Sequence, residues 1–202
     1  MVYNIYRRNI VVLHEERGKM QMKKFKGNLL KFLIMYIFFM AVFVFIFRTV
    51  FMLTLIPTGS MEGTIMSGDI VFATRYNIGA DEIERFDILI FTPPDNPDNT
   101  DETYIKRVIG LPGETIEVKN GKVYADGIEL DDSFVKNPMN RKGDGIYKVP
   151  EGCYFFMGDN RNQSRDSRFW TEKYVPLENI KGKAKSIVYP FTHIHSIEFV
   201  SG

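Results

Sequence analysis

The stretch Phe32–Phe47, FLIMYIFFMAVFVFIF, decides the architecture, because none of its sixteen residues is charged. At about 1.5 Å per residue, a helix of that length is roughly 24 Å long and falls short of a ~30 Å hydrocarbon core. Extension to Leu29 and Arg48 closes the gap, and the side chains of Lys31 and Arg48 can then reach the headgroups on opposite faces. The sequence therefore predicts one transmembrane helix.

Charge is distributed unevenly around this helix. Residues 1–31 carry eight basic and two acidic residues, a net charge of +6, whereas the whole chain of 202 residues carries +1. Basic residues beside a first span stay in the cytoplasm, so we predict a cytoplasmic N-terminus and delivery of the chain from about Pro57 onward across the cell membrane. The alternatives are a buried core helix and a cleaved secretory signal, but no small-x-small pair precedes Pro57.

Three segments follow from this topology: a basic cytoplasmic segment (1–28), the anchor and lead-in (29–56) and an extracytoplasmic domain (57–202). Residues 1–19 show no clear pattern, and Met20 and Met22 are alternative translation starts. The even charge balance gives no sign of a nucleic-acid partner. A single cysteine, Cys153, excludes an internal disulfide framework and a multi-thiolate metal site.

Short runs of β-branched and aromatic residues follow Pro57 and are typical of strands. No long 3.6-residue periodicity appears after Ile56, and Asn120-Gly121 suits a type I′ hairpin turn. We therefore predict an all-β, or β-dominated, exported domain, with irregular connections at Thr92–Thr103 and Asp131–Gly145. The predicted strands are Ile70–Tyr76, Asp87–Phe91, Tyr104–Ile109, Thr115–Lys119, Val123–Ala125, Cys153–Met157, Ser186–Tyr189 and Ile194–Val200.

This domain has few residues that would suit a metal site or one of the common serine-hydrolase motifs. His193 and His195 would share one face of a strand, but no acidic or cysteine cluster accompanies them, so surface histidines are favoured over a metal site. The Ser-x-x-Lys string Ser133–Lys136 lacks the partner strings of penicillin-binding chemistry, and no G-x-S-x-G elbow exists. We expect neither a metal nor another cofactor.

A serine stands in a glycine-rich turn shortly after the predicted anchor, within Pro57–Thr64, PTGSMEGT. One proline and two glycines permit a tight, exposed turn, with hydroxyls at Thr58 and Ser60. By itself, this string is equally typical of a simple linker between anchor and domain.

A second string, Tyr104–Gly110, YIKRVIG, places two adjacent cations in an apolar strand. Strand neighbours point to opposite faces, so we expect one cation to reach solvent and the other to face the core. A lysine buried there without a carboxylate would have a lowered pKa and could accept a proton near pH 7. The alternative is a pair of surface cations on an edge strand.

The third string, Gly158–Trp170, GDNRNQSRDSRFW, is rich in turn formers and charged residues. Asp166 and Arg168 can pair locally, and the serines can hydrogen-bond a neighbouring amine. Because Phe169 and Trp170 follow immediately, we predict a rigid loop packed against the core.

Together the three strings resemble the bacterial type I signal peptidases, membrane-bound serine proteases that remove signal peptides from exported proteins. The resemblance covers the anchor and nearly all of residues 57–190, in the family's order. Its most specific part, G-D-N-R-x-x-S-x-D-S-R, is complete from Gly158 to Arg168. The other matching parts are Ser60-Met61, Gly68–Val71, Arg85–Ile88 and Lys106-Arg107.

The resemblance implies a role for each of several residues. Ser60 would be the nucleophile, Lys106 the general base, and Thr58 a donor to the oxyanion. Ser164 would orient the lysine amine, while Asp166 and Arg168 would support the site. The substrate-binding residues would be Ile56, Met61, Ile65, Tyr104 and Ile105, several of which are alternatively only core. We expect a monomer whose partners are the signal peptides of preproteins and the lipid bilayer.

Three positions depart from the family pattern. Thr58 replaces the usual serine, Gly63 the usual proline and Phe86 the usual glycine. We expect Gly63 to loosen the turn and Phe86 to change the packing, and none of the three removes a reacting group. The alternatives to a signal peptidase are a cytosolic self-cleaving protease of the repressor type with the same dyad, and an inactive, membrane-tethered β-domain that binds partners.

Overall fold

The computed structural model describes residues 2–75, 79, 83–95, 102–140 and 143–197, with the backbone alone for residues 2–16 and 18. The chain divides into two units, residues 1–48 and 49–202. The predicted ends of two strands, at Tyr76 and Val200, and the middle of the predicted loop Thr92–Thr103 lie outside the described residues.

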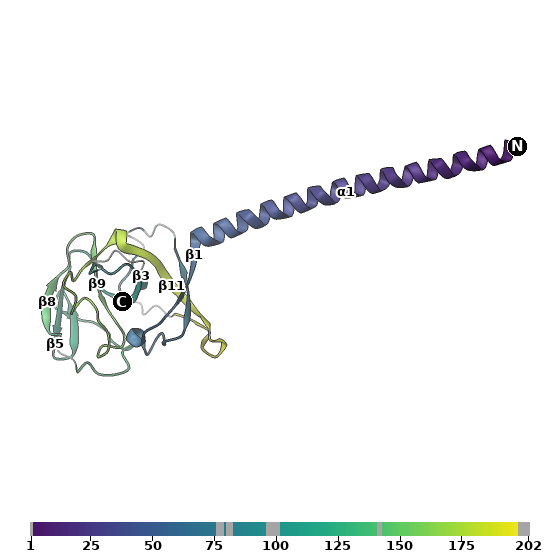
Figure 1. Ribbon diagram of the computed structural model, residues 1–202. Coiled ribbons are helices and arrows are strands. Elements are labelled where there is room, and N and C mark those ends of the chain that lie inside the picture. Colours follow the sequence, from purple (N-terminus) through teal and green to yellow (C-terminus); the bar gives the residue numbers. More distant parts are fainter. Residues whose placement is uncertain (1, 76–78, 80–82, 96–101, 141–142, 198–202) are drawn as a thin grey trace. The chain divides into compact units, whose positions relative to one another are not determined.

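The first unit is formed by one continuous helix, α1 (Val2–Val50) (Figure 1). All nine prolines lie at or after Pro57, so no residue of this segment lacks the amide donor that an α-helix needs. Residues 2–19, part of the segment in which we recognised no pattern, therefore extend the helix rather than forming a separate element. A strand begins at Phe51, within the segment that we predicted as a lead-in.

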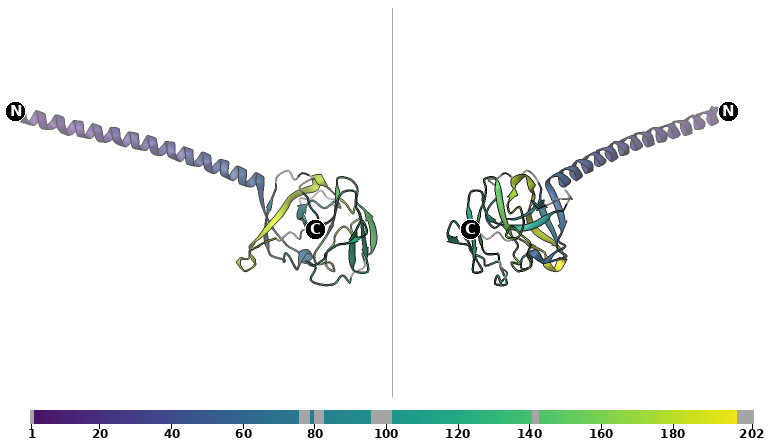
Figure 2. Two further views of the ribbon diagram at one scale, coloured as in Figure 1. Left: turned by 180° about the vertical axis from the view of Figure 1, so that it is seen from behind. Right: turned by 60° about the vertical axis from the view of Figure 1, so that its left-hand side comes forward.

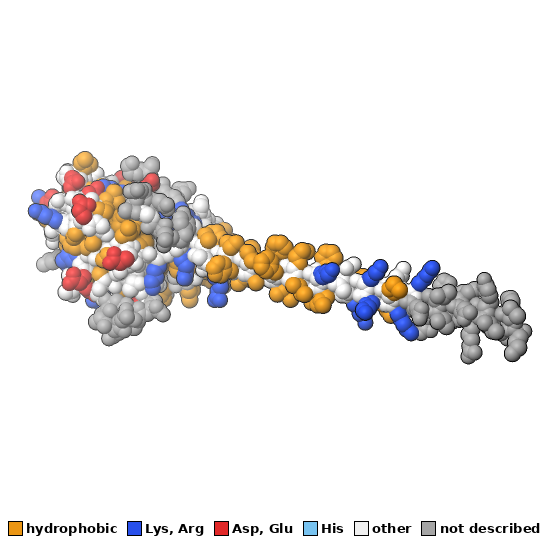
Figure 3. Space-filling model, turned by 90° about the horizontal axis from the view of Figure 1, so that it is seen from above, with side chains coloured by type: hydrophobic (Ala, Val, Ile, Leu, Met, Phe, Trp, Pro, Cys, Tyr) orange, Lys and Arg blue, Asp and Glu red, His pale blue; other side chains and the backbone are white. Residues whose placement is uncertain are grey.

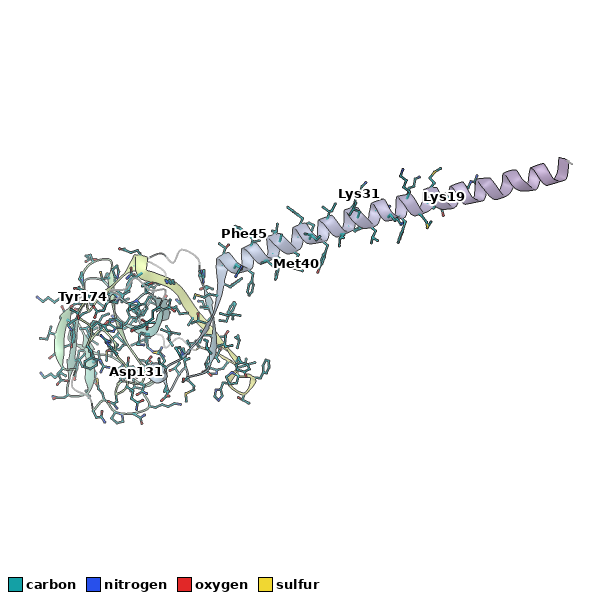
Figure 4. The ribbon with its side chains drawn as sticks, in the orientation of Figure 1. Lys19, Lys31, Met40, Phe45, Asp131 and Tyr174 are labelled. Atoms are coloured by element: carbon teal, nitrogen blue, oxygen red, sulfur yellow. The ribbon has the colours of Figure 1, made fainter. Side chains whose placement is uncertain are left out.

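Lys19–Val50 is long and apolar enough to cross a membrane. Hydrophobic side chains cover the half of the helix toward its C-terminal end, whereas Lys and Arg side chains gather nearer its N-terminus (Figure 3). The labelled side chains Lys19, Lys31, Met40 and Phe45 follow one another along the helix in this order and project outward (Figure 4). This apolar N-terminal helix fits a membrane-anchored protein.

The regular elements of the second unit are mostly strands, which confirms the prediction of a β-dominated domain. Its larger sheet has the order β1-β2-β11-β3-β4-β9-β10, with β12 paired to β11. β11 crosses this sheet beside the N-terminal strands (Figure 2). The strands are β1 (Phe51–Leu55), β2 (Ile70–Thr74), β3 (Ile88–Phe91), β4 (Tyr104–Gly110), β9 (Cys153–Met157), β10 (Val175–Pro176), β11 (Ile180–Tyr189) and β12 (His195–Ser196).

A smaller sheet has the order β7-β6-β5-β8. Asn120 and Gly121 join β5 to β6 with positive φ angles of 51° and 79°, as a type I′ turn requires. Gly145 begins a strand that we had placed at the end of an irregular connection. The strands are β5 (Thr115–Lys119), β6 (Lys122–Ala125), β7 (Ile128–Glu129) and β8 (Gly145–Lys148), and the short 3₁₀ turns of the unit are η1 (Gly59–Met61), η3 (Leu177–Asn179) and η4 (Phe191–His193).

Strand β4 links the hydrophobic cores of the two sheets. Ile105 belongs to the cluster under β1, β2 and β11, whereas Ile109 belongs to the cluster around β5 and β6. Val108 packs in a third cluster with Phe156 and Trp170. With apolar layers on both faces, β4 is buried along almost its whole length, and its polar side chains must find partners inside the protein.

Candidate active site

The turn η1 holds Ser60 against β4. Met61 and Ile65 are fully buried in the same cluster as Ile105, and these two apolar side chains anchor the turn to the hydrophobic core. Ser60, between the exposed Thr58 and the buried Met61, is itself only 6% exposed. The glycine-rich string is therefore a packed turn and not a simple linker.

The amine of Lys106 lies directly beside the Ser60 hydroxyl. Lys106 Nζ is 2.8 Å from Ser60 Oγ and 3.0 Å from the carbonyl oxygen of Ile105. Burial lowers the pKa of Lys106 from its ordinary value of 10.5 to about 8, although Asp166 and Asp159 act in the opposite direction. The net shift corresponds to a free-energy difference of about 3 kcal/mol in favour of the neutral amine. A measurable fraction of the amine is therefore neutral near pH 7 and able to accept a proton.

The Gly158–Trp170 loop is packed and ion-paired, as we predicted. Asp166 and Arg168 form an ion pair at 2.8 Å with both side chains fully buried. Asp166 also accepts a hydrogen bond from the Gly158 amide, and Arg168 donates to the carbonyl of Arg161. These contacts link residues within the loop and hold Gly158 against the Ser60 turn. A Cβ atom at position 158 would collide with the Ser60 carbonyl oxygen.

Two further hydroxyls, those of Thr58 and Ser164, lie close to the Ser60 turn and have different contacts. Thr58 Oγ1 is 3.4 Å from Ser60 Oγ. Ser164 is fully buried, and its hydroxyl has no hydrogen-bond partner among the described residues. The hydrogen bond from Ser164 to the lysine amine that we expected is thus not formed in this structure, although both groups adjoin the same turn.

A groove with a volume of about 430 Å³ runs past Ser60 and Lys106. Three of the five predicted substrate-binding residues, Ile56, Tyr104 and Ile105, line it. Met61 and Ile65 do not, because they are core residues with no exposed surface. Polar residues that we did not predict complete the walls, namely Thr54, Glu102, Thr103, Gln163 and Arg165.

The expectation that one cation of the Lys106-Arg107 pair reaches solvent was wrong, because both side chains are buried. Arg107 is 1% exposed and forms two hydrogen bonds, at 2.8 and 2.6 Å, with the carboxylate of Asp159. The ring of Phe134 covers the guanidinium at 4.1 Å. Strand alternation correctly predicts that Lys106 and Arg107 point to opposite faces of β4. It does not predict that another segment of the chain covers the face on which Arg107 lies.

Sequence reasoning also assigned no role to Asp159 and Asn160. Asp159 pairs with Arg107 and accepts a 2.6 Å hydrogen bond from Thr64. Asn160 contacts the carbonyl groups of Gly59 and Ser60. Their place in the most specific string, G-D-N-R, was the available signal, but their partners lie far away in the sequence.

Two of the departures from the family pattern have unusual backbone conformations. Gly63 has a φ of 115°, which a proline cannot adopt, because its ring fixes φ near −65°. Phe86 has a φ of 72°, in the region that glycine occupies freely. Phe86 is nevertheless buried, with its ring 5.4 Å from that of Phe134.

Replacing Phe86 with glycine is expected to destabilise the protein by about 2 kcal/mol. Removing a buried phenylalanine costs about 3–5 kcal/mol, whereas relief of the positive φ returns about 1–2 kcal/mol. Chemical unfolding in detergent measures the difference. Asn120→Gly is the matched control, because Asn120 has a φ of 51° but is exposed, and it should be neutral or slightly stabilising. A more stable Phe86→Gly variant would mean that strain outweighs packing.

His193 and His195 do not share a strand. His193 ends η4 and lies 3.4 Å from the Asp69 carboxylate, whereas His195 begins β12. Within the described part of the chain, no group of three or more His, Cys, Asp or Glu side chains is arranged to hold a metal ion.

Comparison with known proteins places these features in one family. The family described as "Signal peptidase, peptidase S26" matches residues 28–189. A signal peptidase I from Leptolyngbya laminosa is 37% identical over 144 residues, which cover 69% of each chain. A probable signal peptidase I-2 from Synechocystis is 36% identical over 141 residues, covering 69% of this chain and 63% of its own.

A solved structure, that of a signal peptidase I from Enterococcus faecalis, is 32% identical; the match covers 50% of this chain and 95% of that one, with a TM-score of 0.39. The match to residues 28–189 includes the apolar part of α1, the Ser60 turn, β4 and the Gly158–Trp170 loop. It confirms the family resemblance that these strings carry. The chain belongs to the signal peptidase family, peptidase S26.

Proposed function

We propose that the protein removes signal peptides from exported preproteins with a Ser60/Lys106 dyad. The observation that carries this proposal is the 2.8 Å contact between the serine hydroxyl and a buried amine whose pKa is lowered to about 8. A serine hydroxyl is a weak nucleophile until an adjacent base takes its proton. The relatives named signal peptidase I support the choice of substrate.

The reaction proceeds through an acyl-enzyme. Neutral Lys106 takes the Ser60 proton as Oγ attacks the carbonyl carbon of the scissile peptide bond, and the oxyanion accepts hydrogen bonds from the Ser60 amide and the Thr58 hydroxyl. The C–N bond then breaks, and the lysine returns the proton to the leaving amine. Water hydrolyses the ester with Lys106 again as the base. The buried Asp166–Arg168 pair keeps the surrounding loop fixed during both steps.

The groove fits an extended segment of substrate. It has one wall from the end of β1 and the residues after it, Thr54–Thr58, and another from Glu102–Lys106. Backbone groups of these two segments flank the dyad, so a signal peptide can add to them as a β-strand. The side chains of Ile56 and Ile105 between the walls leave shallow apolar space, which suits the small residues that precede signal-peptide cleavage points.

The outer face of the larger sheet supports a site at the outer membrane surface. Leu55, Ile70 and Tyr189 are direct neighbours across β1, β2 and β11 and therefore share one face. Leu55 is 62% exposed, and the ring of Phe191, 80% exposed, contacts Tyr189. Since β1 follows the apolar helix directly, this face is suited to contact lipid. The positive flank of the helix is consistent with a cytoplasmic N-terminus.

The test is cleavage of a signal-bearing precursor by the full chain in detergent as a function of pH. The pKa of Lys106 is lowered and its neutral form is the active one, so activity should rise as the pH rises through about 8 and then level off. Between pH 6 and 8 the neutral fraction increases roughly 50-fold. A rate that falls over this range would contradict the lysine base.

A chelator distinguishes the proposed lysine-dependent mechanism from a metal-dependent one. EDTA is expected to leave the rate of precursor cleavage unchanged, because no step uses a metal ion. Loss of activity with EDTA would favour a site involving His193 instead. An inactive, tethered binding domain predicts no cleavage at any pH, with or without chelator.

A further inference from the structure

The side chain of Asn160 contacts the Ser60 turn from the far end of the sequence. Its Nδ2 donates to the Gly59 carbonyl oxygen at 3.0 Å and to the Glu62 carboxylate at 3.3 Å. Its backbone amide donates to the Ser60 carbonyl oxygen at 3.1 Å. One residue thus contacts the two consecutive peptide groups on either side of the Ser60 Cα atom.

The first of these peptide groups contains the Ser60 amide. The Gly59 carbonyl and the Ser60 N–H belong to the same planar unit, and in a trans peptide they point in opposite directions. Tyr189–Pro190 is the one cis bond in the part of the chain that the structure describes, so this unit is trans. A donor that fixes the Gly59 carbonyl therefore also fixes the direction of the Ser60 N–H.

We infer that Asn160 is a positioning residue that aims the Ser60 amide at the oxyanion. The inference rests on the proposed function, in which that amide stabilises the negative charge of the tetrahedral intermediate. Gly59 adjoins this peptide group and has no side chain to limit its rotation. The 3.1 Å bond from the Glu62 amide to the Gly59 carbonyl is local to the turn. Asn160 adds a donor from an ion-paired loop, outside the turn.

The test is the isosteric change Asn160→Asp combined with Glu62→Gln, in the full chain in detergent. Aspartate keeps the volume and the backbone hydrogen bond to Ser60 but cannot donate to Gly59, and the Glu62→Gln change prevents repulsion between two carboxylates. Relative to Glu62→Gln alone, kcat should fall about 10- to 100-fold, as expected for a misdirected oxyanion donor. KM should change little, and the pH midpoint set by Lys106 should stay close to that of the wild type, because the double variant keeps one carboxylate beside the turn.

Two further measurements separate positioning from a merely structural role. A peptide aldehyde bonds to Ser60 and places its oxygen where the oxyanion forms, so its inhibition constant should rise by about the same factor as kcat falls. The matched control is Asn162→Ala, in the same loop, whose side chain donates to the Pro138 carbonyl rather than to the turn. This control should retain wild-type kcat and aldehyde affinity.

Retention of kcat by Asn160→Asp/Glu62→Gln within about threefold of Glu62→Gln would overturn the inference. So would equal losses in the double variant and in Asn162→Ala, because the loop as a whole would then be responsible. Both results leave wild-type cleavage intact. Failure of the proposed function would instead appear as absence of precursor cleavage by the wild type.

Discussion

Replacing Ser60 or Lys106 with alanine is expected to abolish cleavage of a signal-bearing precursor, with a loss of at least about 1,000-fold in kcat. Ser60→Ala removes the attacking oxygen, and Lys106→Ala removes the group that takes its proton. Because the two atoms lie 2.8 Å apart and act as a pair, the double variant should be no slower than either single variant. Gel-based cleavage of a precursor by each purified variant in detergent measures the effect.

Folding must be separated from chemistry in this experiment. Lys106 is 5% exposed, so its truncation to alanine leaves a cavity, and Lys106→Met is the better packed variant. The Lys106→Ala and Lys106→Met variants should both unfold at temperatures close to that of the wild type, since removing a buried amine also removes its desolvation cost. Cleavage by folded Lys106→Met near the wild-type rate would disprove the assigned base.

Gly158→Ala is expected to reduce kcat by at least about 100-fold. A Cβ atom at this position would meet the Ser60 carbonyl oxygen and the Ser164 side chain at distances under 3.0 Å, which real Cβ atoms essentially never show. One of the colliding groups is backbone, so the Ser60 turn must move relative to Lys106. A displacement of about 1 Å at reacting groups can cost 100-fold in rate.

Gly79→Ala is the matched control for this change. It adds the same methyl group in the same unit, at a position where no atom of the described residues lies within 4 Å and φ is not positive. Its rate and stability should match those of the wild type. If Gly158→Ala instead retained the wild-type kcat, the packing of the loop against the turn would not determine the geometry of the dyad.

Local patterns in the sequence were sufficient to predict much of the fold, whereas the roles of Ser60 and Lys106 were inferred from the family resemblance. Alternation and turn residues located most of the described strands, because these signals act over a few neighbouring residues, but they missed β1, β7, β8 and β10. The position of Lys106 and Arg107 inside an apolar strand predicted that one of the two would be buried, and both are. The Asp166–Arg168 pair was predictable because its members are two residues apart.

Contacts across the fold were not predictable in this way. The family resemblance assigned Met61 and Ile65 to the substrate pocket, but the turn directs both into the core. Arg107 is buried because Phe134, from another connection, covers it. The hydrogen bond from Asn160 to Gly59 spans 101 residues, beyond any local pattern.

The position of β11 in the larger sheet determines when this sheet can form during synthesis of the chain. This strand, formed by residues 180–189, lies between β2 and β3 in the sheet. A nascent chain that still lacks it has two unpaired strand edges where the finished sheet is continuous. The segments that hold Ser60 and Lys106 therefore become parts of one continuous sheet only after residues 180–189 have been synthesised and paired with both neighbours.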